Sequence, residues 1–549
     1  MVVVGLLAVT GSKTFRWGGR CQAFRPSSSV ARRSTTIRRT HHRHSHNQHH
    51  HDDRDVPHLE INRGVPDLIL PSHPGFPIRS VMAPMVAASD YPFRVFLRER
   101  CGVDLTFTQM LLAKRFNTDE TFRRAHLDLG ECTTAAGGGE GEGGFDAETL
   151  LPSQRECLGD PGDLPPPRKG PPSAAVGGGR PRPLIVQLAG DDPEGVVETA
   201  LSIYEHTDGN LHGIDLNCGC PQGIARKGNY GAFLMDSDPE RVAGVLRALR
   251  KALPDGVAVS AKIRLPPDDG DLVRDRIPRL VGSGDLSFLT IHGRTRAENK
   301  QTVGAVHADR IRLAIETARS IDPAFPVIAN GGMEDRGDVQ TILRTTGASA
   351  AMSSEGLLET PDLFLPSSPP SDPSIPAPED RFRKQVGYAR DYLDVCGRVG
   401  PPLPGVLGFN SGGSFNVVRG HLFKFLHRYL NHDHTDLRND LAAPGKLRTL
   451  SDAHRLLDEL ESRYAGLSAE RWDRLASTPE ESSWYRRHRK PDRAAVHVRH
   501  DLTTTVGRER WSSSGSTVAA TVADRKAAIR ERLAAAKAAR DGATTKRFV

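Results

Sequence analysis

The 549-residue chain has no apolar run near the roughly 20 residues that a helix needs to cross a bilayer. Its apolar start, Val2–Val9, is too short to span one. Cysteine is scarce as well: the chain has seven, which are scattered and include no CxxC pair. This pattern indicates neither a disulfide framework nor a zinc site. We therefore expect no membrane association and no bound metal.

Apolar and aromatic residues are also limited. Hydrophobic residues make up 37% of the chain and the mean hydropathy is −0.43. A length of 549 residues allows two or three domains. The low apolar content therefore predicts that part of the chain stays unstructured.

Acidic residues are missing from one end and sparse at the other. Residues 1–51 hold nine Lys/Arg and no Asp/Glu, and residues 484–549 hold 16 Lys/Arg against six Asp/Glu. Because the net charge is only +7, the middle of the chain is net acidic. A basic tail on an acidic body suggests contact with a polyanion, and a solvated extension is the alternative.

The acid-free start has the composition of an organelle transit peptide, rich in Arg, Ser and Thr. We expect residues 1–60 to be a disordered leader for a plastid or mitochondrion. The run His41–His51 is interpreted as low complexity beside that leader rather than as a metal site.

Residues 77–365 alternate between short apolar runs and amphipathic stretches, which predicts one (β/α)8 TIM barrel. A doubly wound sheet is the alternative, but Met82-Ala83-Pro84-Met85 stands where its GxGxxG turn belongs. Asp192 and Asp238 each precede Pro-Glu and predict helix N-caps. The eight predicted strands are Ser80–Met85, Val103–Thr108, Leu184–Ala189, Gly213–Asn217, Val257–Ile263, Phe288–His292, Val327–Asn330 and Ala348–Met352.

Three segments depart from the β/α alternation. Residues 130–180 contain 13 glycines and seven prolines, so we expect a disordered loop insertion. Residues 366–378 form a Pro/Ser linker. Helical patterns then predict a smaller α-helical domain over 379–477, and the basic tail follows at 484–549.

The polar residues that end the predicted strands supply many hydrogen-bond donors and almost no carboxylate, as expected for an anionic ligand. Paired carboxylates for glycosidase chemistry are missing. Asn330-Gly331-Gly332 and Ser354-Glu355 follow the last two strands, where barrels often bind phosphate. Lys262 supplies a cation and Gln187 an amide for a flavin ring, so the set favours FMN over a nicotinamide cofactor.

The segment Asp215–Gln222 is the most informative, because two cysteines follow its strand. One residue between Cys218 and Cys220 gives poor geometry for a disulfide. We interpret Cys220, between Gly219 and Pro221, as chemically active and Cys218 as incidental.

Taken together, the spaced motifs resemble tRNA-dihydrouridine synthases. The subgroup resembled is the eukaryotic one that acts on D-loop positions 16 and 17. The motifs are Ala83-Pro84-Met85, Gln187-Leu188, Asn217-Cys218-Gly219-Cys220-Pro221, Lys262-Ile263-Arg264, His292-Gly293-Arg294-Thr295 and Asn330-Gly331-Gly332.

The resemblance implies a monomeric flavoprotein that acts on tRNA in the cytoplasm or nucleus. NADPH would reduce FMN, hydride would pass from N5 to C6 of uracil, and Cys220 would protonate C5. Residues implied to contact FMN are Pro84, Met85, Gln187, Lys262, His292, Asn330, Gly331, Gly332, Ser354 and Glu355. Residues expected at the tRNA are Asn217, Arg264 and Arg294 in the barrel, and Arg419, Lys424 and Arg428 in the helical region.

Two other functions remain open at this point. An FMN barrel enzyme acting on a small molecule, such as a dihydroorotate dehydrogenase, would explain the phosphate loops and Lys262 but not the helical appendage or basic tail. A non-catalytic tRNA-binding protein would explain the tail but not Cys220 and the donor set.

Overall fold

The computed structural model describes residues 59–133, 147–166, 183–299, 302–366, 377–404, 413–476 and 483–486. The chain divides into two units, residues 1–53 and 54–549, and all described residues belong to the second. The predicted leader therefore lies outside the described residues except for its last two positions, and so does the basic tail beyond Arg486.

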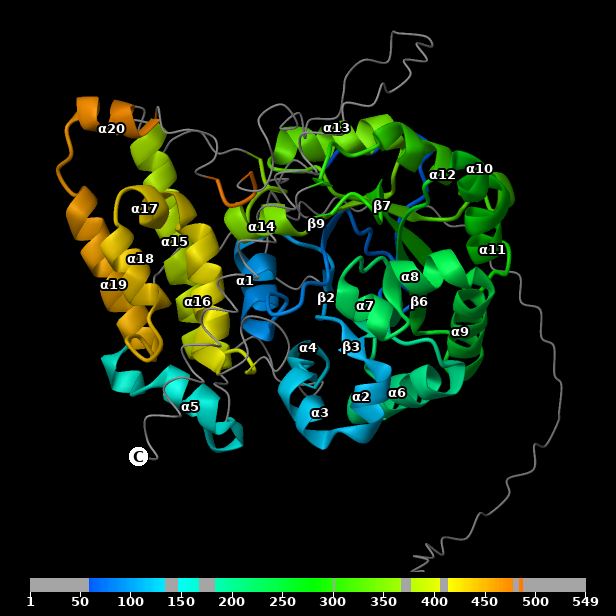
Figure 1. Cartoon of the computed structure of the whole chain (residues 1–549), viewed down its shortest axis with the longest axis horizontal. Coiled ribbons are helices and arrows are strands. Elements are labelled where there is room, and N and C mark those ends of the chain that lie inside the picture. Colours follow the sequence, from blue (N-terminus) through cyan, green and yellow to red (C-terminus); the bar gives the residue numbers. More distant parts are fainter. Residues whose placement is uncertain are drawn as a thin grey trace, which may run out of the picture. The chain divides into compact units, whose positions relative to one another are not determined.

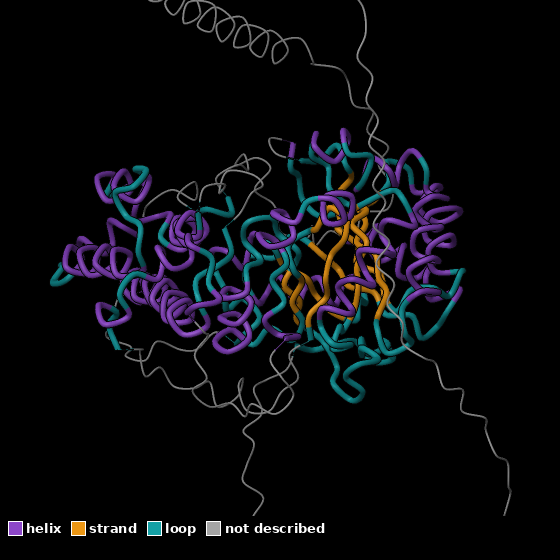
Figure 2. The backbone as a smooth tube through the Cα atoms, turned by 90° about the horizontal axis from the view of Figure 1, so that it is seen from below, coloured by secondary structure: helices purple, strands orange, loops and turns teal. Residues whose placement is uncertain are grey.

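Parallel strands close into a barrel, shown in orange in Figure 2 with helices around them. Hydrogen-bonded neighbours follow the order β1-β9-β8-β7-β6-β5-β4-β2, and a bridge from Val81 to Leu105 joins β1 to β2. The predicted TIM barrel is confirmed, and closure rules out the open doubly wound sheet. The strands are β1 Ser80–Met82, β2 Thr106–Phe107, β3 Leu111–Leu112 (also paired with β4), β4 Leu184–Ala189, β5 Gly213–Cys218, β6 Ala258–Leu265, β7 Phe288–Thr295, β8 Val327–Asn330 and β9 Ala350–Ser353.

Burial on both faces explains why these strands are nearly continuous apolar runs. All six residues of β4 are buried. At the amino-terminal ends of β4, β6 and β7, Ile185, Ala258 and Phe288 pack in one cluster with Leu68 and Ile78 from the segment before β1. This apolar cluster leaves the carboxyl ends as the place for polar side chains.

Helices connect the strands on the outside of the barrel (Figure 1). Asp192 accepts a hydrogen bond from the Gly195 N–H and Asp238 from the Arg241 N–H, so both predicted N-caps are confirmed. The helices are α1 Tyr91–Cys101, α2 Ala113–Thr118, α3 Glu120–His126, α6 Pro193–His206, α7 Gly223–Lys227, α8 Gly231–Ser237, α9 Pro239–Ala252, α10 Asp269–Asp271, a π turn Leu272–Arg276, α11 Ile277–Val281, α12 Ala308–Ile321, α13 Arg336–Thr346 and α14 Glu355–Glu359.

Part of the Gly/Pro-rich insertion is folded, so the prediction of disorder over 130–180 is wrong for residues 147–166. This part contains the turn Ala147–Thr149, α5 Pro152–Leu158 and the turn Pro161–Asp163, and α4 Gly130–Thr133 lies at the start of the insertion. Cys157 and Leu158 are buried, and the Gln154 amide donates to the Pro401 carbonyl at 2.6 Å. Long-range packing on the helical region stabilises α5 despite its unfavourable composition. Residues 134–146 and 167–182 lie outside the described residues.

The predicted helical region follows the barrel and packs against it through α1. Phe93 of α1 stacks on His421 at 4.3 Å between ring centroids and lies 6.1 Å from the ring of Tyr392. Figure 1 shows the two helices that carry these residues, α15 and α16, beside α1. The helices are α15 Ala377–Val399, α16 Ser414–Phe425, α17 His427–His432, α18 Thr435–Ala442, α19 Leu450–Tyr464 and α20 Ala469–Ala476.

Within the described ranges, none of the helices combines the length and the apolar character that crossing a bilayer requires.

Candidate active site

Strand register brings most of the predicted site residues to neighbouring positions at the carboxyl ends of the strands. Asn217 of β5 pairs with Lys262 of β6. Arg264 of β6 pairs with His292 of β7, and His292 pairs with Asn330 of β8. Separate apolar runs of the sequence thus converge on one polar end of the barrel.

A buried hydrogen-bond network fixes the amides at this end. The Gln187 amide donates to Asp215 at 2.8 Å, and the Asn217 amide donates to the Gln187 carbonyl oxygen at 2.8 Å. Ser260 donates to the other Asp215 oxygen at 2.7 Å. Burial raises the pKa of Asp215 to about 6, although these two donors and Lys262 oppose the rise. Asp215 therefore acts as a structural acceptor that orients Gln187.

The loop after β5 is held in a defined conformation around Cys220. Asn217 Oδ1 accepts from the backbone N–H groups of Gly219 at 3.1 Å and Cys220 at 3.0 Å. Arg264 Nε donates to the Gly219 carbonyl at 2.9 Å. Two side chains that we expected at the substrate therefore also shape the loop.

The two cysteines of this loop differ in exposure. Cys220 is partly exposed, whereas Cys218 is buried. Burial raises the pKa of the Cys220 thiol, and the Gln222 N–H, Arg264 and Lys262 only partly oppose this. Cys220 is thus a protonated thiol at neutral pH, as a proton donor must be. Burial also raises the pKa of Cys218, which is consistent with an inert core thiol.

Lys262 places a cation beside the loop. Burial lowers its pKa to about 8, with a further lowering by Arg264, while Asp215 and Cys220 favour the charged form. Among the described residues, none accepts a hydrogen bond from its ammonium group. A cation in this state is available to an anionic ligand.

The remaining basic groups are tied to the protein. Arg294 is buried, its Nε donates to the Gly304 carbonyl at 2.9 Å, and its Nη1 lies 3.2 Å from His292 Nε2. With the arginine as donor, His292 accepts through Nε2. Arg264 Nη1 donates to the Thr295 carbonyl at 3.0 Å.

The loop after β8 depends on its two glycines. Gly331 has φ +103° and Gly332 φ +76°, values that L-residues with side chains rarely adopt. A Cβ on Gly331 would lie 3.0 Å from the His292 ring. The Asn330 amide donates to the Met352 carbonyl at 2.7 Å, which joins this loop to β9. The backbone of Gly331 therefore passes close to the His292 ring.

The other predicted FMN contacts lie on adjacent strand ends. Met82 pairs with Ser353, so Pro84 and Met85 follow β1 next to Ser354 and Glu355 after β9. The Met85 N–H donates to Ser89 Oγ at 2.7 Å. These four residues are brought to the same end of the barrel as Cys220.

Arg419, Lys424 and Arg428 do not join this cluster and lie on α16 and α17. Helix α16 packs against α14, which follows β9. The Arg419 guanidinium donates to Asn416 at 2.8 Å and lies 5.6 Å from the Phe415 ring. Lys424 Nζ donates to the Gly420 carbonyl at 2.8 Å. Their contact with tRNA stays a prediction.

The first residues of the predicted basic tail are anchored rather than extended into solvent. Glu359 accepts from Ser483 Oγ at 2.7 Å, from the Trp484 N–H at 3.2 Å and from the Tyr485 N–H at 2.9 Å. Arg486 pairs with Glu334 at 2.6 Å. We call residues 483–486 the tail anchor, and it lies beside α14 and the loop that follows β8.

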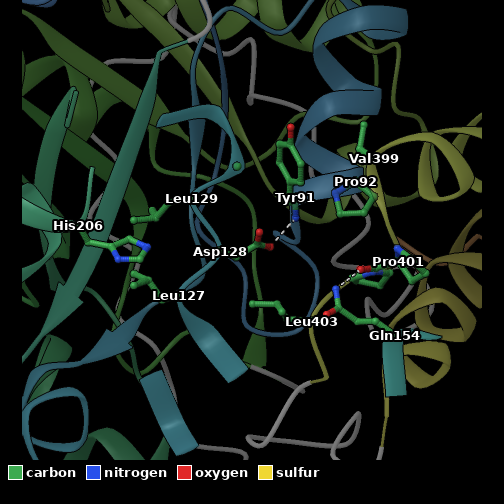
Figure 3. Close-up of a pocket in the computed structure, with 12 residues that line it drawn as sticks. Tyr91, Pro92, Leu127, Asp128, Leu129, Gln154, His206, Val399, Pro401 and Leu403 are labelled. Carbon is green, nitrogen blue, oxygen red and sulfur yellow. Dashed lines mark hydrogen bonds between the residues drawn. The ribbon is translucent and has the colours of Figure 1, made fainter. Parts of the chain in front are cut away.

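A separate cavity of about 220 Å³ lies outside the barrel, between the start of α1 and the loop after α15. Figure 3 shows Tyr91, Asp128 and Gln154 around it. None of the predicted site residues lines this cavity, and it does not belong to the strand-end cluster.

Sequence patterns alone did not identify two residues of the strand-end site. Ser260 was missed because its single hydrogen bond to Asp215 has no sequence signature. Tyr230 was not singled out, although its buried side chain belongs to the cluster against which Cys220 packs. Gly228 and Gly231, on either side of it, are the sequence signal that could have marked its turn.

Comparisons with known proteins show which family the chain is similar to. A family model described as dihydrouridine synthase matches residues 173–395. A tRNA-dihydrouridine(16/17) synthase (NAD(P)(+))-like protein of Mus musculus is 30% identical over 385 residues, which covers 70% of this chain and 62% of the mouse protein. The Rattus norvegicus protein of the same name is 30% identical over 385 residues, which covers 70% of this chain and 67% of the rat protein.

A yeast relative extends the comparison beyond mammals. The tRNA-dihydrouridine(16/17) synthase (NAD(P)(+)) of Schizosaccharomyces pombe is 27% identical over 364 residues, covering 66% of this chain and 73% of that protein. The chain thus spans about two thirds of the length of these relatives. On the family model and these identities, the chain belongs to the dihydrouridine synthase family.

Proposed function

We propose that the protein is an FMN-dependent tRNA-dihydrouridine synthase that uses NADPH to reduce the C5–C6 bond of uridine at D-loop positions 16 or 17. The observation that carries this proposal is the partly exposed, protonated Cys220 on a fixed loop beside the Lys262 cation. The relatives named for the 16/17 activity support the choice of substrate.

The strand ends fit FMN on two observations. The ammonium of Lys262 has no hydrogen-bond acceptor among the described residues, as expected for a group that meets the electron-rich edge of a flavin. Gly331 and Gly332 adopt backbone angles that favour glycine, and a Cβ on Gly331 would meet the His292 ring, so this loop brings backbone rather than a side chain to the barrel end. We propose that Pro84, Met85, Gln187, Asn330, Ser354 and Glu355 complete the cofactor contacts.

Bound FMN would supply hydride transfer to C6 of the uracil. Cys220 would give its thiol proton to C5 as a general acid. Asn217 would hold the Cys220 loop beside the base through the N–H bonds that its side-chain oxygen accepts. Arg264 and Arg294 would face the uridine or its phosphate.

A uridine must leave the folded tRNA to reach a barrel end, so we expect base flipping. The remaining tRNA would contact the helical region, residues 379–477, through Arg419, Lys424 and Arg428. We propose this region as the tRNA-binding domain, with the protein acting as a monomer.

The test combines an absorbance spectrum with a tRNA assay. We expect a flavin band in the purified full-length protein, or after reconstitution with FMN, and formation of dihydrouridine at position 16 or 17 when NADPH and unmodified tRNA are added. The Cys220→Ala variant should keep the band and lose the product. A flavoprotein that reduces orotate or another small enone but not tRNA would instead support the small-molecule oxidoreductase.

A further inference from the structure

Tyr230 lies in a turn whose backbone is shaped to reach the Cys220 loop. The turn joins α7 to α8, which lie next to one another beside the barrel (Figure 1). Asn229 has φ +50° and Gly231 φ +68°, so Tyr230 sits between two left-handed residues. A Cβ on Gly231 would lie 2.8 Å from the Cys220 carbonyl oxygen and 3.0 Å from the Cys220 Cβ. Glycine at 231 therefore permits this close approach.

The Tyr230 ring is equally constrained. A Cβ on Gly228 would lie 2.7 Å from the ring edge, so the ring packs directly over this glycine. Tyr230 is 3% exposed and belongs to the apolar cluster against which Cys220 packs, together with Met110 and Ala225. The ring is thus fixed within the cluster against which Cys220 packs.

The hydroxyl of this buried side chain has no hydrogen-bond partner among the described residues. Buried polar atoms are almost always hydrogen-bonded, so an orphaned hydroxyl requires an explanation. Burial, and to a lesser extent the charge of an ionised Cys220, raise the pKa of Tyr230 to about 12. The phenol therefore keeps its proton and remains a donor over the whole range in which a thiol titrates.

In the structure the hydroxyl has no partner among the described residues, the Cys220 sulfur included. We propose that the Tyr230 hydroxyl donates a hydrogen bond to the Cys220 sulfur once that sulfur has lost its proton and turned toward it, which makes Tyr230 a positioning residue for the reduction. The inference rests on the proposed function for its consequence in turnover. When Cys220 protonates C5, its S–H bond breaks, a C5–H bond forms, and the electron pair stays on sulfur as a thiolate. Bound reduced flavin would supply the two electrons to C6 as hydride, and solvent would later reprotonate the sulfur.

Other groups also face Cys220 and set the baseline for this effect. Lys262 and Arg264 favour the thiolate through their charge, and the Gln222 backbone N–H does so as a donor. Removing the Tyr230 hydroxyl leaves these three in place, so the change in thiol titration isolates the contribution of the phenol.

The direct test is the pH dependence of alkylation at Cys220 in the full-length protein. Iodoacetamide reacts with thiolates, and mass spectrometry of the Cys220 peptide separates this site from the other cysteines. In Tyr230→Phe we expect the midpoint of alkylation to rise by about one to two pH units, because a hydrogen bond to a charged group is lost. Tyr230→Met also removes the hydroxyl and should raise the midpoint too. It replaces the phenylalanine variant if that variant folds poorly. Tyr204→Phe on α6 is the matched control and should leave the midpoint unchanged.

Single-turnover reduction of tRNA by the prereduced enzyme supplies the second readout. Tyr230→Phe should slow this step about tenfold and move the alkaline limb of its pH profile upward, with little change in KM. A slowed reaction with unshifted pH profile and alkylation midpoint would mean a structural role and overturn the inference. If Tyr230→Phe shifts the alkylation midpoint as expected but the wild-type protein never reduces tRNA, the proposed function fails while the Tyr230–Cys220 bond stands.

Discussion

The carboxylate of Asp90, at the N-cap of α1, accepts a hydrogen bond from His421 Nε2 of α16 at 2.7 Å. The same carboxylate accepts from the Phe93 N–H and from the Tyr392 hydroxyl, each at 3.1 Å. Burial by itself would raise the pKa of Asp90, but His421 and the two other donors hold it below the usual value. Burial lowers the pKa of His421, which keeps it neutral and able to donate. One buried carboxylate thus joins the barrel to the helical region.

Asp90→Ala should therefore destabilise the protein strongly. The change removes an N-cap, worth about 1 kcal/mol, and leaves two buried donors unpaired at about 1–3 kcal/mol each. Asp90→Asn keeps an acceptor and should cost less. Thermal unfolding monitored by circular dichroism measures the stability of both variants. An equal, small loss of stability in the two would show that Asp90 does not hold the barrel and the helical region together.

Acid should weaken the stabilising contribution of Asp90. Because the folded-state pKa of Asp90 is depressed, its contribution to stability is present above the unfolded pKa of roughly 4 and is lost as pH falls through the folded value. Wild-type protein should lose stability toward pH 3 more steeply than Asp90→Asn. Urea unfolding at pH 7 and pH 3.5 gives the comparison, and parallel losses in both proteins would refute it.

The two cysteines of the loop after β5 should behave differently. Cys220→Ala should lower tRNA reduction by about 10²–10⁴-fold, because the general acid is lost, while reduction of the flavin by NADPH continues. Cys218→Ala should retain turnover and cost only about 1 kcal/mol of stability, since that thiol is a buried core group. Stopped-flow flavin spectra and dihydrouridine assays separate the half-reactions. Equal loss of product in both variants would rule out Cys220 as the specific proton donor.

Flavin affinity should depend on pH through Lys262. Burial lowers the pKa of the free lysine to about 8, so the ammonium is charged below that pH and increasingly neutral above it. An anionic ligand favours the charged form, so the Kd for FMN should rise above pH 8 by up to about tenfold per pH unit. Lys262→Met should bind more weakly at pH 7 and show no such rise. Lys251→Met, at an exposed position on α9, is the control for general charge.

Much of the barrel was predictable because strands buried on both faces leave apolar runs in the sequence. Each of the eight predicted runs overlaps a strand, although Val103–Thr108 shortens to Thr106–Phe107 and Phe288–His292 lengthens to Phe288–Thr295. The register between strands was not predictable, and register is what brings Asn217 to Lys262 and His292 to Asn330. Polar strand ends could be identified singly, but not their mutual hydrogen bonds.

Long-range packing explains what the sequence concealed. Helix α5 lies in Gly/Pro-rich sequence and folds because Cys157 and Leu158 are buried against the helical region. Arg264 was expected at the substrate, yet its guanidinium also holds the Gly219 carbonyl, 45 residues earlier. Neither contact has a local pattern, since both depend on residues far apart in the chain.

The tail anchor should depend on Glu359. This carboxylate accepts three hydrogen bonds from residues 483–485, so Glu359→Ala should release the segment and expose Arg486. We expect tryptic cleavage after Arg486 to become about tenfold faster or more, as the loss of about 1.5 kcal/mol of local stability implies. Glu316→Gln, at an exposed position on α12, is the control. Unchanged cleavage in Glu359→Ala would show that the anchor is not held by this residue.

Deleting residues 487–549 tests the tail while keeping the anchor. The removed segment carries 15 Lys/Arg against six Asp/Glu, whereas the chain between the leader and the tail is net acidic. Affinity for a molecule as large as tRNA comes mostly from phosphate contacts, and each one contributes to the salt dependence of binding. We therefore expect weaker tRNA binding and a shallower slope of log K against log salt in the truncated protein.

Turnover at saturating tRNA should barely change in this truncation, because contacts made equally in the ground and transition states affect KM rather than kcat. The anchor ends beside α14 and the loop after β8, so the basic segment begins next to the strand ends that carry the proposed site. Equal affinity and equal salt slope for the full-length and truncated proteins would leave the tail as a solvated extension. A fall in kcat instead would mean that the tail orders the active end of the barrel and does not merely hold the tRNA.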